Sequence, residues 1–239
     1  MKKSFFIYGS KNSLDFNIMI ESYPSYKAAE REIQEYQVPG RSGNLVFDTG
    51  SYKNVAQEYE VCMKADPLNT HQIARAAANW LLAPGGYKKL EDSYDPEIYR
   101  MAVFSGPAEV ENWFAKYGRV TLEFNCMPQR FLKSGDFERE LENNGAIFNP
   151  GMDALPLIRL TGSGSGTLVV GGYSVRVSSI PAARLWIGCD TQNAYSGTQN
   201  ENNILTMSNG FPVLPPGSVK IGWSGGIQEV FLTPRWWMI

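Results

Sequence analysis

The chain has 239 residues, of which 43% are hydrophobic and 13% aromatic, enough for one large domain or two ordinary ones with packed cores. With 22 basic and 24 acidic residues the formal net charge is −2, so the composition lacks the basic excess that bulk nucleic-acid binding requires. A channel through which nucleic acid merely passes would need no such excess. No run of about 18 apolar residues occurs, which argues against a membrane-spanning helix.

The reactive residue types are few and scattered. Three cysteines (Cys62, Cys126 and Cys189) stand far apart with no metal-ligand spacing, which favours reduced, structural thiols and assembly inside a cell. The single histidine, His71, makes histidine-based catalysis or a zinc site improbable. The apolar run that follows Lys2 and Lys3 is too short for a signal peptide and is better interpreted as a first strand.

Apolar and polar residues alternate along much of the first half of the chain. This alternation predicts strands over 4–8, 14–20, 31–38, 45–47 and 55–64. Helix propensity competes with it over 26–33, but the reversal that follows needs an extended arm before it. Asp48-Thr49-Gly50-Ser51 is typical of a turn.

The reversal itself is the most specific local signal. Pro39 fixes its own φ and cannot donate a ladder hydrogen bond, while Gly40 and Gly43 reach positive φ at no steric cost. Arg41 stands at the tip with five donors in a rigid fork. We therefore expect a hairpin that presents Arg41 either to a neighbouring subunit or to a carboxylate of its own domain. Pro39, Gly40, Arg41 and Gly43 form the predicted inter-subunit contact.

One helix is predicted, over 69–82, because Ile73, Ala76, Ala77, Trp80 and Leu81 recur at helical spacing before a Pro-Gly-Gly stop. Further strands are predicted over 87–90, 99–104, 109–114 and 119–126. Polar residues then dominate from 134 to 145, which indicates a junction between domains 1–135 and 136–239.

The second domain shows no helical pattern. Its predicted strands lie at 155–161, 167–171, 173–178, 184–189, 204–207, 219–222 and 227–232, a spacing that favours a β-sandwich. The glycine-rich stretch 162–166 lies between two of them and is predicted to be a mobile hairpin tip.

No catalytic constellation emerges. The carboxylate pairs, such as Glu58 with Glu60 and Glu91 with Asp92, are better explained as solvated surface than as acid–base pairs. Gly162-Ser163-Gly164-Ser165-Gly166 does not have serine at the centre of a nucleophile elbow. Gly40-Arg41-Ser42-Gly43 lacks the Lys-Ser/Thr of a phosphate-binding loop. We predict no enzyme activity, no cofactor and no metal site.

A sugar-binding module is an alternative function from another class. Tyr195 and Trp223 are its candidate contacts, because an exposed aromatic ring can stack on the apolar face of a sugar. The competing explanation for such residues in a sandwich is core packing.

Several stretches, taken in order, resemble the distal tail (Dit) proteins of long-tailed phages or prophages. They are Val38–Gly43 followed by Tyr52–Val55, then Leu155–Leu160, Phe211–Ile221 and Pro234–Trp236. The likeness covers nearly the whole chain, with the change of domain at the corresponding place.

The resemblance implies a mainly β protein with an N-terminal ring-forming domain and a C-terminal galectin-like β-sandwich. It implies a homo-hexameric ring at the tail tip of the virion, assembled in the host cytoplasm, with DNA passing through the channel without specific binding. The implied partners are the tail tube protein, a tail-associated fibre or lysin protein, and receptor-binding or baseplate proteins. No catalytic residues and no inserted carbohydrate-binding module are implied.

Overall fold

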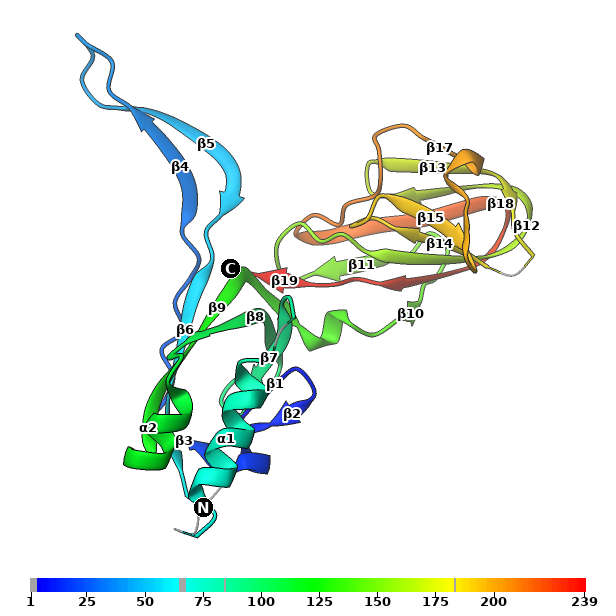
Figure 1. The fold of residues 1–239 in the computed structure, drawn as a ribbon. Coiled ribbons are helices and arrows are strands. Elements are labelled where there is room, and N and C mark those ends of the chain that lie inside the picture. Colours follow the sequence, from blue (N-terminus) through cyan, green and yellow to red (C-terminus); the bar gives the residue numbers. More distant parts are fainter. Residues whose placement is uncertain (1–3, 65–67, 84, 183) are drawn as a thin grey trace. The chain divides into compact units, whose positions relative to one another are not determined.

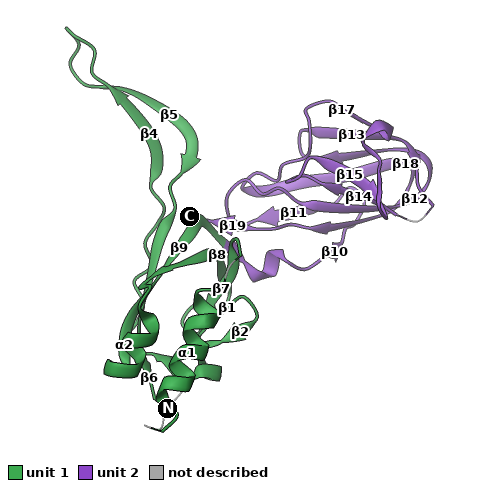
Figure 2. Ribbon diagram, viewed as in Figure 1, with its two compact units in different colours: residues 1–130, 239 green, residues 131–238 purple. Residues whose placement is uncertain are grey.

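The computed structural model describes residues 4–64, 68–83, 85–182 and 184–239. The chain divides into two compact units, residues 1–130 with 239 (unit 1) and residues 131–238 (unit 2) (Figure 2). Both are built mainly from strands, so the predicted mainly β class is confirmed. The predicted junction between 135 and 136 lies a few residues beyond this division.

Unit 1 contains a curled antiparallel sheet and two α-helices (Figure 1). Its strands follow the order β2-β1-β7-β8-β9-β6-β3. Their bounds are Lys11–Asn12, Phe6–Tyr8, Lys88–Asp92, Ile98–Gly106, Arg119–Leu132, Val55–Met63 and Ile18–Ile20, respectively. The N–H of Ile20 donates to the carbonyl of Ser4, so the β3 end of the sheet approaches the segment that leads into β1.

The core of unit 1 is aromatic. Phe6 stacks on Tyr59 and Trp80, and Phe124 meets Phe6 edge-on, at centroid distances of 5.5–5.7 Å. Trp80 comes from helix α1 (Thr70–Leu81), and its indole N–H donates to the Tyr8 carbonyl at 3.0 Å. The predicted helix over 69–82 is therefore confirmed, and its apolar stripe is the face that closes this core.

Two expectations for unit 1 are wrong. Residues 109–114, predicted as a strand, begin a second helix, α2 (Val110–Tyr117), which ends at Gly118 with a left-handed φ of 65°. Val110 and Phe114, four residues apart, are its buried positions, so a 3.6-residue period was present. The predicted strand over 14–20 is instead a 3₁₀ turn, η1 (Ser13–Phe16), followed by β3, because left-handed Asn17 interrupts the extended chain.

Unit 2 is organised around two long strands, β12 (Leu157–Val170) and β18 (Gly217–Thr233), which pair along almost their whole length. The first half of β12 pairs with β14 (Leu185–Gly188), and its second half pairs with β13 (Tyr173–Ile180). The remaining strands are β10 (Arg139–Glu140), β11 (Ala146–Asn149), β15 (Asn193–Ser196), β16 (Gln199–Asn200), β17 (Leu205–Met207) and β19 (Trp237–Met238). A short 3₁₀ turn, η3 (Asn202–Ile204), precedes β17, and η2 (Lys133–Gly135) opens the unit.

The two halves of the long strands enclose one core. Ile158 and Leu160 from the first half of β12 lie in the same buried cluster as Leu168 and Val170 from its second half. The sheet therefore folds over itself into two layers. One layer, which we call the front layer, contains the second half of β12 with β11, β13 and β17. The other, the back layer, contains the first half of β12 with β10, β14, β15 and β16.

The stretch 162–166 is a corner within β12 and not a mobile hairpin tip. A Cβ on Gly162 would overlap the carbonyl oxygen of Gly226, and a Cβ on Gly226 would overlap that of Ser163. The glycines allow the backbones of β12 and β18 to cross closely where the register shifts. The two strands predicted on either side of this stretch, 155–161 and 167–171, therefore belong to the single strand β12. The two strands predicted at 219–222 and 227–232 likewise belong to the single strand β18.

Candidate assembly interface

The most exposed element of the described chain is a hairpin in unit 1, formed by β4 (Arg31–Tyr36) and β5 (Leu45–Tyr52). Every residue from 31 to 51 is exposed, and the hairpin extends beyond the unit 1 sheet (Figure 1). The strand predicted over 31–38 is confirmed as β4. The predicted turn at 48–51 is wrong, because β5 continues through it.

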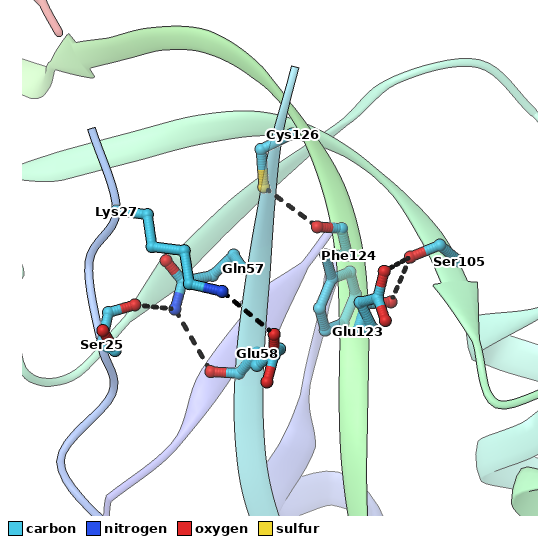
Figure 3. Close-up of polar contacts among 8 residues, drawn as sticks. All are labelled: Ser25, Lys27, Gln57, Glu58, Ser105, Glu123, Phe124 and Cys126. Carbon is cyan, nitrogen blue, oxygen red and sulfur yellow. Dashed lines mark hydrogen bonds and ion pairs between the residues drawn. The ribbon is translucent and has the colours of Figure 1, made fainter. Parts of the chain in front are cut away.

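Polar contacts fix the chain where it enters the hairpin. Tyr26 donates its hydroxyl to Asp92 at 2.8 Å, and Gln57 donates its amide to the Ser25 carbonyl at 3.2 Å. Lys27 pairs with Glu58 at 3.3 Å, and Figure 3 shows how this pair and the Gln57–Ser25 bond connect the segment before β4 with strand β6. The base of the hairpin is thus attached to the unit 1 sheet.

Buried Asp92 is the centre of this attachment. Its carboxylate also accepts the hydroxyl of Tyr59 at 2.9 Å and the backbone N–H groups of Tyr94 and Asp95. Burial raises the pKa of Tyr59 well above the ordinary value, and the neighbouring Asp92 raises it further. The pKa of Tyr26 is raised for the same two reasons. Both hydroxyls therefore stay protonated and act as donors.

The strand register gives the hairpin one distinctly apolar face. Tyr36 lies opposite Leu45 and Gln34 opposite Phe47, so these four side chains share a face. The Tyr36 hydroxyl donates to Gln34 at 2.6 Å along that face. Tyr36, Leu45 and Phe47 are 54%, 46% and 60% exposed. We call these three residues the apolar hairpin face.

Near its base the hairpin carries a bulge. Gly50 has a φ of 77°, and its N–H donates to the Asp48 carboxylate at 2.8 Å. Arg31 Nε lies 2.6 Å from Asp48 Oδ2, and its guanidinium lies over the Tyr52 ring. The Gly50 N–H and then Arg31 lower the pKa of Asp48. The residues that indicated a turn form this bulge instead.

The tip has the geometry that its sequence predicts. Arg41 N–H donates to the Val38 carbonyl at 3.2 Å, and Gly40 has a φ of 80°, as the third residue of a type II turn requires. Gly43 follows with a φ of 83°. In the described part of the chain, no hydrogen bond or ion pair holds the Arg41 guanidinium, so the own-domain carboxylate partner is not seen.

The two predicted sugar contacts lie in different layers of unit 2. Trp223 is on β18 in the front layer, where it packs partly against the core. Tyr195 is on β15 in the back layer and stacks on Trp186 at 6.4 Å. They therefore do not form one site.

Within the described residues, no group of three or more His, Cys, Asp or Glu side chains is placed to hold a metal ion. No helix among those residues is long and apolar enough to span a bilayer.

Residues 1–127, more than half of the chain, match the family model described as phage tail protein N-terminal domain. The chain belongs to this family. It is a phage tail protein, and the predicted relationship is confirmed.

Among solved structures, the chain is similar to the SPP1 Dit (gp 19.1) protein, described as a paradigm of the hub adsorption apparatus in phages that infect Gram-positive bacteria. The likeness covers 100% of both chains with a TM-score of 0.77 at 13% identity. At this identity it shows a shared fold, so the predicted likeness to distal tail proteins holds for the fold. No curated protein matches the chain in sequence.

Proposed function

We propose that this tail protein is a structural, non-enzymatic hub of the phage tail tip whose N-terminal domain assembles into a homo-hexameric ring. The observation that carries the proposal is the β4–β5 hairpin with its exposed apolar face. A two-stranded hairpin alone is marginally stable in water. A neighbouring subunit that covers Tyr36, Leu45 and Phe47 would remove that apolar surface from solvent.

A closed ring also suits the strand-rich unit that carries the hairpin. A head-to-tail contact that repeats around a rotation axis uses the hairpin of each copy once and leaves none unpaired. Arg41, at the tip and without a partner in the described chain, is the charge that such a contact would satisfy. Pro39, Gly40 and Gly43 hold the tip in the conformation that presents it.

In this proposal the ring joins the tail tube to the tail-associated fibre or lysin protein, and DNA passes through its channel. The formal net charge of −2 suits passage without specific binding. The C-terminal domain, as a galectin-like sandwich, would provide attachment surfaces for receptor-binding or baseplate proteins. Assembly would take place in the host cytoplasm, before the virion is released.

The experiment is light scattering of the purified full chain after size exclusion, with the Phe47→Asp variant beside it. The unaltered chain should elute with six times the 26.7 kDa chain mass. Phe47→Asp places a charge on the apolar hairpin face and should give monomers. Because Phe47 is 60% exposed, its thermal unfolding should change little.

Phe137→Asp is the matched control, since Phe137 is 68% exposed but lies outside the hairpin. This variant should remain hexameric. A Phe47→Asp protein that still forms six-chain particles would show that the hairpin face does not build the ring. A chain that is monomeric at every concentration would contradict the ring itself.

A further inference from the structure

The front layer of unit 2 has a broad groove on its outer face. Its volume is about 630 Å³. The residues that line it come from β12, β18 and the loop before β11, and they include Asn144, Thr167, Val169, Gly171, Lys220, Gly222 and Ser224. No role in ring assembly has been assigned to this surface.

Strand register explains the hollow. Thr167 lies opposite Ser224, and Val169 lies opposite Gly222, so their outward positions form neighbouring rows across β12 and β18. Gly171 and Gly222 contribute no side chains, which lowers the floor. A Cβ on Gly222 would lie 3.0 Å from Oδ1 of Asn144, so the amide of Asn144 borders the floor at this point.

One edge of the groove, the β18 backbone at Trp223, is held in place by a side chain from the loop before β11. Asn143 accepts a hydrogen bond from the Trp223 N–H at 2.8 Å and donates its amide to the Trp223 carbonyl at 3.0 Å. Trp223 lies opposite buried Leu168, so its ring faces the unit 2 core and only its backbone can face the groove. The two hydrogen bonds therefore fix the β18 backbone at one edge of the groove.

The donor set suits a saccharide better than a protein segment. Hydroxyls of Thr167 and Ser224 and the amide of Asn144 can donate to and accept from sugar hydroxyls. Of the lining residues only Val169 is a markedly exposed large apolar side chain, at 41%, which is too little for a protein-binding core.

The charges of the groove favour an acidic ligand. Lys220 is the one ionisable residue in the lining, and no carboxylate lines the groove among the described residues. Arg176 lies on β13 directly opposite Thr167 and is also exposed. In the described part of the chain, neither cation has a hydrogen bond or ion pair from its side chain.

We propose that this groove binds an acidic saccharide. Lys220 and Arg176 pair with its acidic groups, and Asn144, Thr167 and Ser224 hydrogen-bond its hydroxyls. The inference does not depend on the hexameric ring, since all of these residues belong to unit 2.

The test is binding of the full chain to an array of acidic and neutral oligosaccharides, followed by titration with the strongest acidic member. The acidic members include uronate, sulfated and phosphorylated sugars, which distinguish a carboxylate from a phosphate or a sulfate. Lys220→Glu reverses the groove charge, and Gly222→Val fills the floor. Lys64→Glu, an exposed position in unit 1, makes the same change of net charge outside the groove.

We expect an acidic saccharide to bind, and both groove variants to weaken its binding at least tenfold while Lys64→Glu retains it. Thermal unfolding identifies a variant that fails to fold, and Lys220→Glu, on an exposed strand position, keeps the test valid if Gly222→Val does not fold. No binding to any acidic member would overturn the proposal. Equal binding of neutral members, or full affinity in Lys220→Glu, would overturn it as well.

Discussion

Arg31 Nε lies 2.6 Å from Asp48 Oδ2 across the base of the β4–β5 hairpin. Both side chains are about half exposed, so the pair gains little from low dielectric. Its consequence is local, because Asp48 also accepts the Gly50 N–H and thereby fixes the bulge. The hairpin thus satisfies one arginine internally, whereas Arg41 at its tip has no partner in the described chain.

These two arginines should respond differently to removal. Arg41→Ala should weaken the hexamer, because it deletes only a charge that faces outward, and the fold should be intact. Arg31→Ala should loosen the hairpin itself, because Asp48 loses its cross-strand partner. Hydrogen exchange over residues 31–52 should therefore quicken in Arg31→Ala but not in Arg41→Ala.

Light scattering supplies the second measurement for this pair. Dissociation to smaller species at micromolar concentration is expected for Arg41→Ala. Unchanged hexamers in that variant would contradict the proposed role of Arg41. The apolar hairpin face would then be the remaining proposed contact between subunits.

The corner between β12 and β18 gives a prediction about stability. Gly226→Ala places a Cβ against the Ser163 carbonyl oxygen, and neither backbone can move without breaking the ladder. We expect a loss of about 3 kcal/mol in the free energy of unfolding of unit 2, at the upper end for overpacking. Chemical denaturation monitored by tryptophan fluorescence measures it.

Gly172→Ala is the matched control for the corner. A Cβ on Gly172 meets nothing within 4 Å, and its φ is not in the left-handed region, so its cost should be under about 0.5 kcal/mol. Equal stabilities of the two variants would mean that the close crossing of β12 and β18 is not present in solution.

The parts of the fold that could be predicted from the sequence are those that depend on interactions between residues close together in the chain. Pro39 and Gly40 set the hairpin turn by their own backbone preferences, and the stripe of α1 is visible within one helix. Alternation over 31–38 likewise predicted the strand that is β4. The exposure of Tyr36, Leu45 and Phe47 was not predicted, since burial depends on whether another element covers a strand.

The errors have two sources. The error at 109–114 was local, because Val110 and Phe114 already stand at helical spacing and Gly118 provides the left-handed end. Elsewhere, distant chain segments decide. The glycines of 162–166 have the composition of a loop, but their role is set by β18, some 60 residues later. Lys220 joins Thr167 and Ser224 in the groove only through the pairing of β18 with β12, which the sequence does not reveal.

The Asp92 attachment predicts a loss of stability in alkali. The folded-state pKa of Tyr59 is raised above its unfolded value of about 10, so its contribution is fully present below pH 10. As pH rises further, only the unfolded state releases the proton. The free energy of unfolding should then fall by about 1.4 kcal/mol per pH unit for this group.

Urea denaturation at pH 8 and pH 11 measures this dependence. Tyr59→Phe should lower the stability at pH 8, because Asp92 loses a donor, and should flatten the decline above pH 10. Tyr117→Phe, at a position 59% exposed, should leave the decline unchanged. A Tyr59→Phe variant with the same alkaline slope as the unaltered chain would refute the assignment.

The central claim is that the β4–β5 hairpin contacts a neighbouring copy of the chain. Benzoylphenylalanine in place of Phe47 tests it most directly, because its photo-cross-link forms only with groups in contact with the apolar hairpin face. After irradiation of the assembled particle, the account predicts covalent dimers on a denaturing gel, joined from position 47 to unit 1 of the second chain. Six-chain particles that give only uncross-linked or internally cross-linked monomers would contradict it.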